Sequence, residues 1–362
     1  ILNRNIKYLV ILLLIGAGGF ILNTLNDAGE FKTISPHFDG ECIPIPGAVG
    51  AEDITILKNG MALISSHDRR YALAGIPAKS AIFSSDLEDE TPRLMNLTAD
   101  LLFEFNPHGI SVFENSDGSY RVAAINHTSN GHSIEIFDYR NDSLIHQQSI
   151  RDPLLISPND LVLINASQMY VTNDHGSTSD WEKTLEEYLQ LKRANVVFYD
   201  GSDFSIASEN LGYANGINIS LDGKILYVAE TVGKKLSMYS RNPVTNKLTF
   251  LQSIDMHSGV DNIELDEKGN LWIGSHPKLL TFTRHAKDAD VLSPSQVFRL
   301  TPKAENDFVI EEIFLSKGDD LSGSSVGAVF GNTLLIGSVF RRKKFIKRIN
   351  RKNLIVYTSK NR

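Results

Sequence analysis

The sequence predicts an all-β protein, a six-bladed β-propeller with an N-terminal hydrophobic helix and a short lid helix. Pairs of short apolar strands separated by tight turns recur six times, and polar residues precede each pair at intervals of 56, 51, 56, 46 and 63 residues. This spacing suits four-stranded units arranged radially around a common axis. The polar residues that begin the units are Glu52-Asp53, His108, Asn159-Asp160, Asn215, Asp261-Asn262 and Ser324-Ser325.

A targeting segment precedes the repeats. Arg4 and Lys7 lie before or at the start of fifteen uncharged residues, Tyr8 to Leu22. This run is shorter than a membrane span of about 20 residues, but no small-x-small cleavage site follows it. We expect residues 1–30 to be an uncleaved signal anchor or transmembrane segment, with a cleaved signal peptide and a buried element of the domain as alternatives. Its basic flank predicts that the propeller lies outside the cytoplasm, on the periplasmic or extracellular side.

The rest of the chain divides into a predicted propeller domain, residues 31–346, and a basic C-terminal tail, residues 347–362. Of the 36 Lys and Arg residues, ten lie from Arg341 to Arg362 without an acid, so the preceding residues carry 26 basic and 43 acidic groups. An acidic body argues against nucleic acid as a partner and is compatible with a cation site. The tail is either solvated or contacts anionic lipid headgroups.

One helix is predicted among the strands. Ser179 and Glu182 form a capping-box pattern, and apolar residues recur at helical spacing along one face. We expect this insertion to cover the top of the propeller as a lid. Packing against the propeller is the simpler explanation of that face, and contact with a membrane or substrate is the alternative. The face consists of Trp181, Leu185, Tyr188 and Leu189.

The polar residues that begin the repeats offer oxygen ligands. Carboxylate and amide oxygens suit Ca²⁺, which takes about 6 to 8 of them in irregular geometry. Asp53 and Asp160 each follow a residue of this ring and could serve a second ion deeper in the channel. Any one of these residues could instead cap its own turn. The predicted ring is Glu52, Asn159, Asn215, Asp261 and Asn262.

Rival catalytic motifs are missing from the sequence. It contains no HExxH zinc motif and no P-loop, and its GxSxG pattern at residues 323–327 begins a predicted strand pair instead of forming a strand-to-helix nucleophile elbow. It also has no GxGxxG that follows a strand and opens a helix. Chemistry at a metal ion held by oxygen ligands therefore remains the leading hypothesis.

The sequence also resembles the paraoxonase family of calcium-dependent lactonases and arylesterases. The resemblance runs in order from about Glu41 to Phe340, through segments that include GAEDITILKNGMALISS, FNPHGIS, YANGINIS, VDNIELD and WIGSHP. It implies a six-bladed propeller with two Ca²⁺ ions, one catalytic and one structural, and a retained N-terminal anchor. Many motifs in one order are far more specific than any single one.

The resemblance also implies roles for individual residues. It assigns the catalytic calcium to Glu52, Asn159, Asn215, Asp261 and Asn262. It assigns the structural calcium to Asp53, Asp160 and the backbone carbonyl of Ile110. It assigns a catalytic histidine dyad to His108 and His127. The matching substrate-pocket positions are Tyr71, Asp174, His175, Tyr213 and His276.

Two departures from the family accompany this match. Cys42 matches one half of a family disulfide, but it is the only cysteine in the chain, and no partner lies near Ile346. We therefore expect strand pairing alone to close the ring. Ser275 stands where the family has a free cysteine beside the pocket, and we expect this change to leave hydrolysis intact.

The expected function is calcium-dependent hydrolysis of lactones and aryl esters, with organophosphates as possible promiscuous substrates. A polarised carbonyl would be attacked by a water that a histidine activates, with His108 as the leading base and Asp261 as the alternative. A membrane-anchored binding scaffold and a sugar-lactone hydrolase are the competing hypotheses.

Overall fold

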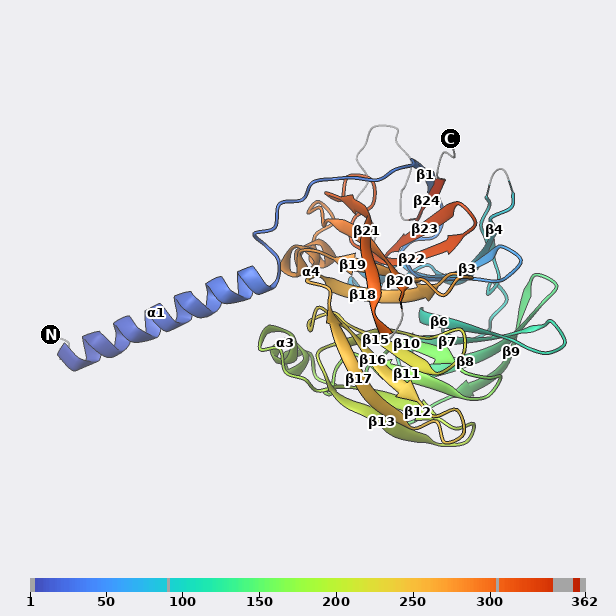
Figure 1. Ribbon diagram of the computed structural model, residues 1–362, viewed down its shortest axis with the longest axis horizontal. Coiled ribbons are helices and arrows are strands. Elements are labelled where there is room, and N and C mark those ends of the chain that lie inside the picture. The colour runs from blue at the N-terminus through green and yellow to red at the C-terminus, as the bar shows by residue number, and fades with distance from the viewer. Residues whose placement is uncertain (1–3, 90–91, 304–305, 341–353, 359–362) are drawn as a thin grey trace.

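The protein is a ring of antiparallel sheets from which one long helix projects, as Figure 1 shows. The structure is a computed structural model that describes residues 4–89, 92–303, 306–340 and 354–358. The ring consists of six four-stranded sheets. The predicted all-β propeller class is confirmed, and so is the N-terminal apolar helix.

Five of the sheets are each built from four consecutive strands. The first contains β2 (Ala51–Ile56), β3 (Met61–His67), β4 (Ser80–Asp86) and β5 (Met95–Asn96). The second contains β6 (Pro107–Glu114), β7 (Tyr120–Thr128), β8 (Gly131–Arg140) and β9 (Ser143–Ile150). The third contains β10 (Pro158–Leu163), β11 (Met169–Asn173), β12 (Ala194–Tyr199) and β13 (Phe204–Leu211).

The fourth and fifth sheets repeat this plan. The fourth contains β14 (Ala214–Ile219), β15 (Ile225–Glu230), β16 (Lys235–Arg241) and β17 (Leu248–Asp255). The fifth contains β18 (Gly259–Leu265), β19 (Leu271–His276), β20 (Ser295–Pro302) and β21 (Phe308–Ser316).

The remaining sheet joins the two ends of the propeller. Its order is β1-β24-β23-β22, from β1 (Glu41–Ile45), β24 (Leu354–Thr358), β23 (Thr333–Ser338) and β22 (Ser324–Phe330). The sixth sequence unit thus supplies two consecutive strands, and the structure has five blades of consecutive strands where the repeat predicted six. Strand pairing closes this composite sheet, because Cys42 lies opposite Tyr357.

The composite sheet also uses part of the segment predicted to be a basic tail. Within residues 347–362, Leu354–Thr358 form β24 between β1 and β23. The predicted boundary at residue 346 therefore cuts across this sheet. The other residues of the segment, and Ile346 with them, lie outside the described residues.

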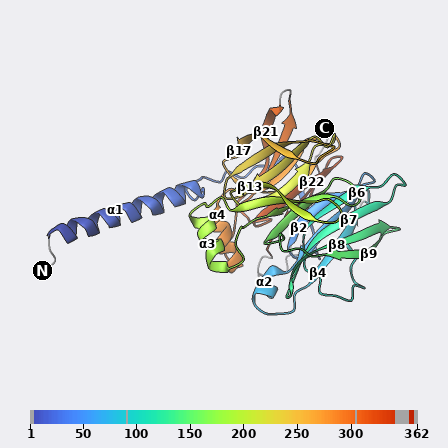
Figure 2. The same cartoon turned by 90° about the horizontal axis from the view of Figure 1, so that it is seen from below.

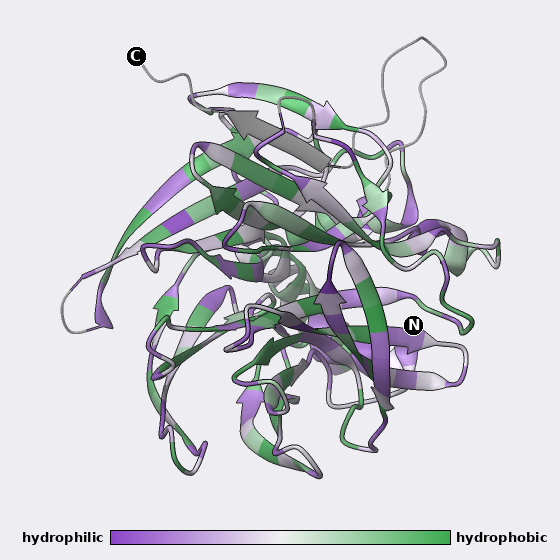
Figure 3. Ribbon diagram, turned by 90° about the vertical axis from the view of Figure 1, so that its right-hand side faces the viewer, coloured by the Kyte–Doolittle hydropathy of each residue, from purple (hydrophilic) through white to green (hydrophobic). Residues whose placement is uncertain are grey.

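Apolar side chains fill the space between neighbouring sheets. Green, apolar stretches run along strands of the sheets in Figure 3. One cluster of buried apolar residues lies at each junction between two sheets. Between the second and third sheets, for example, Ile125 and Ile134 belong to the same cluster as Leu161 and Val171. The first strands of neighbouring sheets contact one another around the ring. This packing holds the starts of all six first strands near one axis.

The described residues form four helices outside the sheets: α1 (Arg4–Asp27), α2 (Arg69–Leu73), α3 (Asp180–Tyr188) and α4 (Leu279–Lys287). Figure 2 shows α3 and α4 beside the C-terminal end of α1. Asp27 pairs with Lys234, and Glu30 accepts hydrogen bonds from Thr281. These contacts fix the end of α1 against the propeller.

Helix α1 differs in length from the apolar run that predicted it. It has 24 residues, so it extends beyond Tyr8–Leu22 on both sides. In the part of the chain that the structure describes, it is the one helix long and apolar enough to cross a membrane. None of its residues in the apolar window is buried against the propeller.

Helix α3 presents its apolar face to solvent instead of packing it against the propeller. Trp181, Leu185, Tyr188 and Leu189 are exposed, and Glu186 is the buried residue of this helix. The expected capping box is not formed either, because the Ser179 hydroxyl donates to the Glu182 carboxylate instead of accepting from the backbone. The simpler explanation of the apolar face, packing on the propeller, is therefore wrong.

Candidate functional site

A β-bulge lies at the start of every first strand, at the residues that the repeat singled out. The register of β2 against β3 shifts between Ala51 and Asp53, at Glu52. The equivalent shift in β6 falls at His108. The corresponding shifts in the other four first strands flank Asn159-Asp160, Asn215, Asp261-Asn262 and Ser325. A bulge breaks the alternation of side chains and re-aims them, which lets consecutive residues both face the channel.

Two glycines allow neighbouring first strands to approach closely at this level. A Cβ on Gly109 would lie 2.4 Å from Asp160 Oδ1, and a Cβ on Gly216 would lie 2.4 Å from the Asp261 carbonyl oxygen. Any other residue would push these strands apart. Both glycines directly follow a residue of the predicted site, His108 or Asn215, and so help to bring the polar side chains together.

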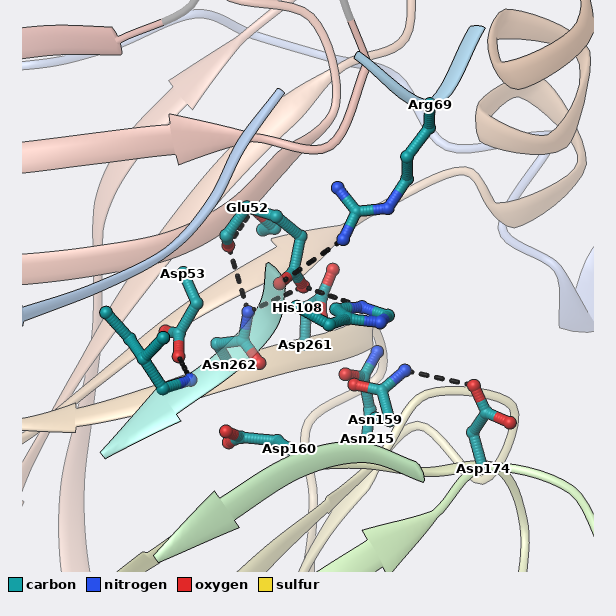
Figure 4. A network of polar contacts seen from close by, with 12 residues as sticks. Glu52, Asp53, Arg69, His108, Asn159, Asp160, Asp174, Asn215, Asp261 and Asn262 are labelled. Atoms are coloured by element: carbon teal, nitrogen blue, oxygen red, sulfur yellow. Dashed lines mark hydrogen bonds and ion pairs between the residues drawn. The ribbon is translucent and has the colours of Figure 1, made fainter. Parts of the chain in front are cut away.

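The five residues of the predicted ring meet at the channel mouth, where Figure 4 shows them pointing toward one another. All are nearly or fully buried. Each has one oxygen that accepts no hydrogen bond from any described residue. We call these atoms the five free oxygens: Glu52 Oε2, Asn159 Oδ1, Asn215 Oδ1, Asp261 Oδ1 and Asn262 Oδ1.

Neighbouring side chains hold the other polar atoms of the ring. The Asn159 amide donates to Asp174 Oδ2 at 3.0 Å, and the Asn215 amide donates to Thr231 Oγ1 at 3.0 Å. The Asn262 amide donates to Glu52 Oε1 at 2.8 Å. Because each amide nitrogen is bound on its own side, the amide oxygen is turned toward the centre of the ring.

The two carboxylates of the ring have different electrostatic surroundings. Burial would raise the pKa of Glu52, but the positive charge and hydrogen bond of His108, together with Arg69 and Asn262, lower it to about 2. Burial raises the pKa of Asp261 despite the opposing effect of His276, whose Nε2 lies 2.7 Å from Asp261 Oδ2. The ring thus concentrates negative charge and oxygen lone pairs in a buried space.

Asp53 and Asp160, the acids predicted to hold a second ion, are bound by backbone amides. Asp53 accepts hydrogen bonds from Ile54 N and Ile110 N, at 2.9 and 2.7 Å. Asp160 accepts from Leu161 N and Ile217 N, at 2.7 and 2.8 Å. Ile110 and Ile217 belong to the next sheet in each case, so we call these acids the interblade pair. Ile110 contacts Asp53 through its amide, whereas the prediction used its carbonyl.

Burial raises the pKa of both members of the interblade pair. The charge of Glu52 adds to this effect at Asp53, and the charge of Asp53 adds to it at Asp160. The backbone hydrogen bonds oppose the shift without cancelling it. Two acids held this close favour either protonation or a nearby cation.

The predicted histidine dyad is a chain of three histidines. His108 Nδ1 lies 2.7 Å from His127 Nε2, and His127 Nδ1 lies 2.8 Å from His132 Nδ1. His108 faces the ring, with its Nε2 3.5 Å from Glu52 Oε1. Burial, together with the charges of His108 and His132, lowers the pKa of His127 well below its ordinary value. Sequence reasoning missed His132, although it lies directly opposite His127 in the β7–β8 hairpin.

A cavity of about 410 Å³ opens above the ring. Its floor includes four of the five ring residues and His108, and its wall includes Leu279, Phe282 and Phe340. Two of the residues predicted for the substrate pocket, Tyr213 and His276, line this cavity. Among the described lining residues, Tyr71, Asp174 and His175 are absent, and Tyr71 is instead 42% exposed on α2.

Asp174 and His175 lie behind the cavity and connect the ring to α3. Asp174 accepts from the Asn159 amide and lies 2.6 Å from His175 Nδ1, while His175 Nε2 lies 3.2 Å from Glu187 Oε1. Burial would lower the pKa of His175, but its two carboxylate partners raise it to about 9. At neutral pH the His175 imidazolium therefore links Asp174, which binds the Asn159 amide, to Glu187 of α3.

Arg69 is a second residue that sequence reasoning missed. It lines the cavity and its Nη2 lies 3.8 Å from Glu52 Oε2. The signal was present in the order of strands, since β2 leaves the channel mouth at Glu52 and the antiparallel β3 returns to it just before Arg69. A basic residue after β3 therefore had to lie near the ring.

The ring residues fit a hard divalent cation. The five free oxygens come from two carboxylates and three amides, a donor set that Ca²⁺ prefers and that balances its charge. Among the described side chains, no group of three or more His, Cys, Asp or Glu residues could hold a metal by itself. The three amide oxygens of Asn159, Asn215 and Asn262 are needed, with the two carboxylates, to give enough oxygen ligands for a cation. Buried polar atoms are nearly always bonded, so five buried oxygens without a hydrogen bond at one point form a set of donors that a cation could use.

Comparisons with known proteins identify the family of this chain. A sequence model of the Arylesterase family matches residues 42–347. Serum paraoxonase/arylesterase 2 of Rattus norvegicus is 34% identical over 305 residues, covering 81% of this chain and 84% of the relative. Serum paraoxonase/arylesterase 1 of Homo sapiens is 34% identical over 302 residues, with the same coverage of 81% and 84%.

Two solved structures share the fold at low identity. A luciferin-regenerating enzyme gives a TM-score of 0.55 at 11% identity and covers 88% of this chain and 95% of its own. Regucalcin of Agrobacterium tumefaciens, a calcium-binding protein, gives a TM-score of 0.51 at 12% identity and covers 90% and 93%. These likenesses concern the fold alone.

Fold and site together define a β-propeller enzyme whose channel mouth combines buried oxygen donors with a histidine chain. The extent of the family match and the identity to the curated relatives make the assignment specific. The chain belongs to the paraoxonase/arylesterase family and is a carboxylic ester hydrolase.

Proposed function

We propose that this protein hydrolyses lactones and aryl esters with the help of calcium bound at the five free oxygens. The single observation that carries the proposal is the convergence of these oxygens, which accept no hydrogen bond from the described residues, beside His108 at the floor of one cavity. We take the composite sheet to act as the sixth blade, because it brings Ser325 to donate to the Glu52 carbonyl at 2.6 Å and so braces the ring.

The calcium ion would be held by Glu52, Asn159, Asn215, Asp261 and Asn262. When bound, it supplies a Lewis acid that polarises the carbonyl group of the substrate. The interblade pair is proposed to hold a second, structural ion, since a cation would relieve the mutual repulsion of two buried acids. Both carboxylates also accept backbone hydrogen bonds.

His108 is the proposed general base. Its Nε2 faces the ring, and a water molecule between it and the substrate would lose a proton as its oxygen bonds to the carbonyl carbon. The same proton would then pass to the leaving oxygen as the ester bond breaks. His127, kept neutral by burial, can accept a hydrogen bond from His108 Nδ1 and so leave Nε2 open to the water. Asp261 is the less favoured base, since its Oδ2 is already engaged by His276.

The cavity wall favours apolar substrates. Leu279, Leu280, Phe282, Val339 and Phe340 line it and offer few of the polar contacts that a sugar lactone needs. The substrates best matched to the wall are aryl esters and lactones with aliphatic substituents. A binding scaffold without catalysis would have no use for the histidine chain beside the ring.

We also propose that α1 anchors the protein to a membrane with the propeller on the periplasmic or extracellular side. The support is the exposure of α1 and the exposed apolar face of α3 near its end. Fractionation of expressing cells would test this proposal: the full chain should sediment with membranes and a version lacking Arg4–Asp27 should not. A soluble full-length protein would contradict it.

The decisive test of function is hydrolysis of phenyl acetate and of a γ- or δ-lactone, with calcium and after chelation. We expect activity that chelator abolishes and calcium restores. Calcium binding should be measured separately by isothermal titration calorimetry. A folded protein that binds calcium at the ring but hydrolyses neither substrate would favour the scaffold.

A further inference from the structure

The Arg69 guanidinium is buried in the cavity wall, and neither of its terminal nitrogens has a hydrogen-bond partner among the described residues. Its side chain is 14% exposed, and neither Nη1 nor Nη2 bonds to any residue that the structure describes. The 3.8 Å between Nη2 and Glu52 Oε2 exceeds hydrogen-bond distance. Arg69 therefore offers two unused charged donors inside the cavity.

The position of these donors points to the reacting group of a ligand. Figure 4 shows the guanidinium directed at Glu52, next to His108 and Asp261. Leu279 and Phe282, which line the same cavity, are apolar. A ligand that used Arg69 would therefore place its anionic oxygen beside the ring and its apolar part against the wall.

A neutral partner does not explain Arg69 well. A buried guanidinium remains protonated, and planar forked donors match negatively charged oxygens better than neutral ones. Glu52 Oε2 is the closest carboxylate oxygen that pairs with it, yet this atom is one of the five free oxygens. An anionic oxygen from the ligand would satisfy Arg69 while Glu52 remains available to the cation.

We infer that Arg69 is a further catalytic residue, which donates to the carbonyl oxygen of the ester or lactone as that oxygen becomes negative. This inference rests on the proposed function. Water oxygen bonds to the carbonyl carbon, the carbonyl π pair moves to the carbonyl oxygen, and the water proton goes to His108. When the ester C–O bond breaks, the pair returns to re-form the carbonyl and the proton goes to the leaving alcohol oxygen.

Arg69 binds the negative oxygen more strongly than the neutral carbonyl. Hydrogen bonds between two charged groups are about twice as strong as neutral ones, and this contrast is greatest in a site that excludes water. Interactions present only in the transition state change kcat more than KM. The same preference makes tetrahedral anions, such as an arylphosphonate, good ligands of this cavity.

The kinetic test uses the calcium-loaded full chain. Arg69→Leu should lower kcat for phenyl acetate by about 100-fold, as loss of one oxyanion donor does in other hydrolases, with KM within threefold. Arg69→Lys should recover part of the loss. Lys58→Gln is the matched control. It removes an exposed positive charge between β2 and β3, which pairs with Glu114 of the second sheet. A kcat within threefold of the unchanged protein in Arg69→Leu would overturn the inference.

A binding measurement decides the matter without activity. Phenylphosphonate should bind the calcium-loaded protein at least tenfold more tightly than it binds Arg69→Leu, as measured by calorimetry. Equal phosphonate binding by the two proteins would show that Arg69 only balances the negative charge of Glu52. A change in calcium affinity with unchanged phosphonate binding and kcat would show the same. If Arg69→Leu does not fold, Arg69→Gln is used in both measurements. Absence of hydrolysis by the unchanged protein would refute the proposed function and with it the catalytic role of Arg69, while the phosphonate comparison would still decide whether Arg69 binds an anionic oxygen in this cavity.

Discussion

The predicted ring and the interblade pair use adjacent residues of the same bulges, but they differ in how their side-chain oxygens are hydrogen-bonded. Glu52 and Asp53 are neighbours in sequence, as are Asn159 and Asp160. Backbone amides of the next sheet donate to Asp53 and Asp160, whereas Glu52 and Asn159 each keep an oxygen that accepts no hydrogen bond from a described residue. The interblade pair therefore forms its hydrogen bonds on folding, whereas the ring leaves oxygens to which we propose that a cation binds.

The strongest test of this difference is the isosteric exchange Glu52→Gln. We expect calcium affinity to fall at least 100-fold and ester hydrolysis about 1000-fold, because the ring loses one of the two carboxylates that balance the ion. Calorimetry with calcium and a phenyl acetate assay measure the two effects. The matched control is Asp53→Asn, one residue away, which should keep more of the activity. Equal losses in both variants would remove the distinction between ring and pair.

The next test concerns the base beside the ring. His108→Gln keeps a side chain that can hydrogen bond but cannot take a proton at neutral pH. We expect kcat to fall by about 10² to 10⁴, the usual contribution of a general base, with calcium affinity within threefold. His146→Gln is a suitable control, since His146 contacts Glu135 on the outer part of the second sheet. Activity within twofold of the unchanged protein would transfer the base role to Asp261.

A third test asks whether the ring depends on support from outside the channel. His175 has an ordinary pKa of 6.5 and a folded-state pKa of about 9, so its charged form stabilises the fold. This contribution is fully present below pH 6.5 and is lost as pH rises through 9. The shift corresponds to about 3 kcal/mol.

Urea unfolding at pH 6.5 and pH 9.5 measures that loss. The unchanged protein should lose more stability over this interval than His175→Gln, which lacks the titrating group. Loss of the His175 charge should also lower calcium affinity, because His175 pairs with Asp174, and Asp174 orients Asn159. Parallel pH profiles for the two proteins would show that His175 does not couple α3 to the fold.

The smallest expected effect lies in the interblade pair itself. In Asp53→Asn, one backbone amide faces an NH₂ group instead of an oxygen. We expect the free energy of unfolding without calcium to fall by about 1 to 3 kcal/mol, the usual cost of an unsatisfied buried donor. Denaturant unfolding in chelator measures it, with Glu52→Gln as the reference. A larger loss of stability in Glu52→Gln than in Asp53→Asn would reverse the comparison.

Much of the fold and of the ring could be predicted from the sequence because both follow a repeat. One polar residue before each strand pair, at near-constant intervals, fixes a common level in a radial fold. The His132 partner of His127 and the Arg69 side chain were missed because neither belongs to the repeated position. Hairpin pairing and strand direction could have revealed them. The apolar face of α3 misled the prediction, since periodicity shows that a face exists without showing what covers it.

The sequence by itself determined that polar residues begin six strand pairs and that their oxygens suit a hard cation. It also determined that a long apolar segment precedes them. Only the tertiary structure decided which oxygens keep a free lone pair and which are bound by the next sheet, because that depends on bulges and interblade amides rather than on residue type. It also decided that β1 and β24 close the ring and that Arg69 reaches the cavity. These outcomes depend on contacts between segments far apart in the chain, which no local pattern encodes.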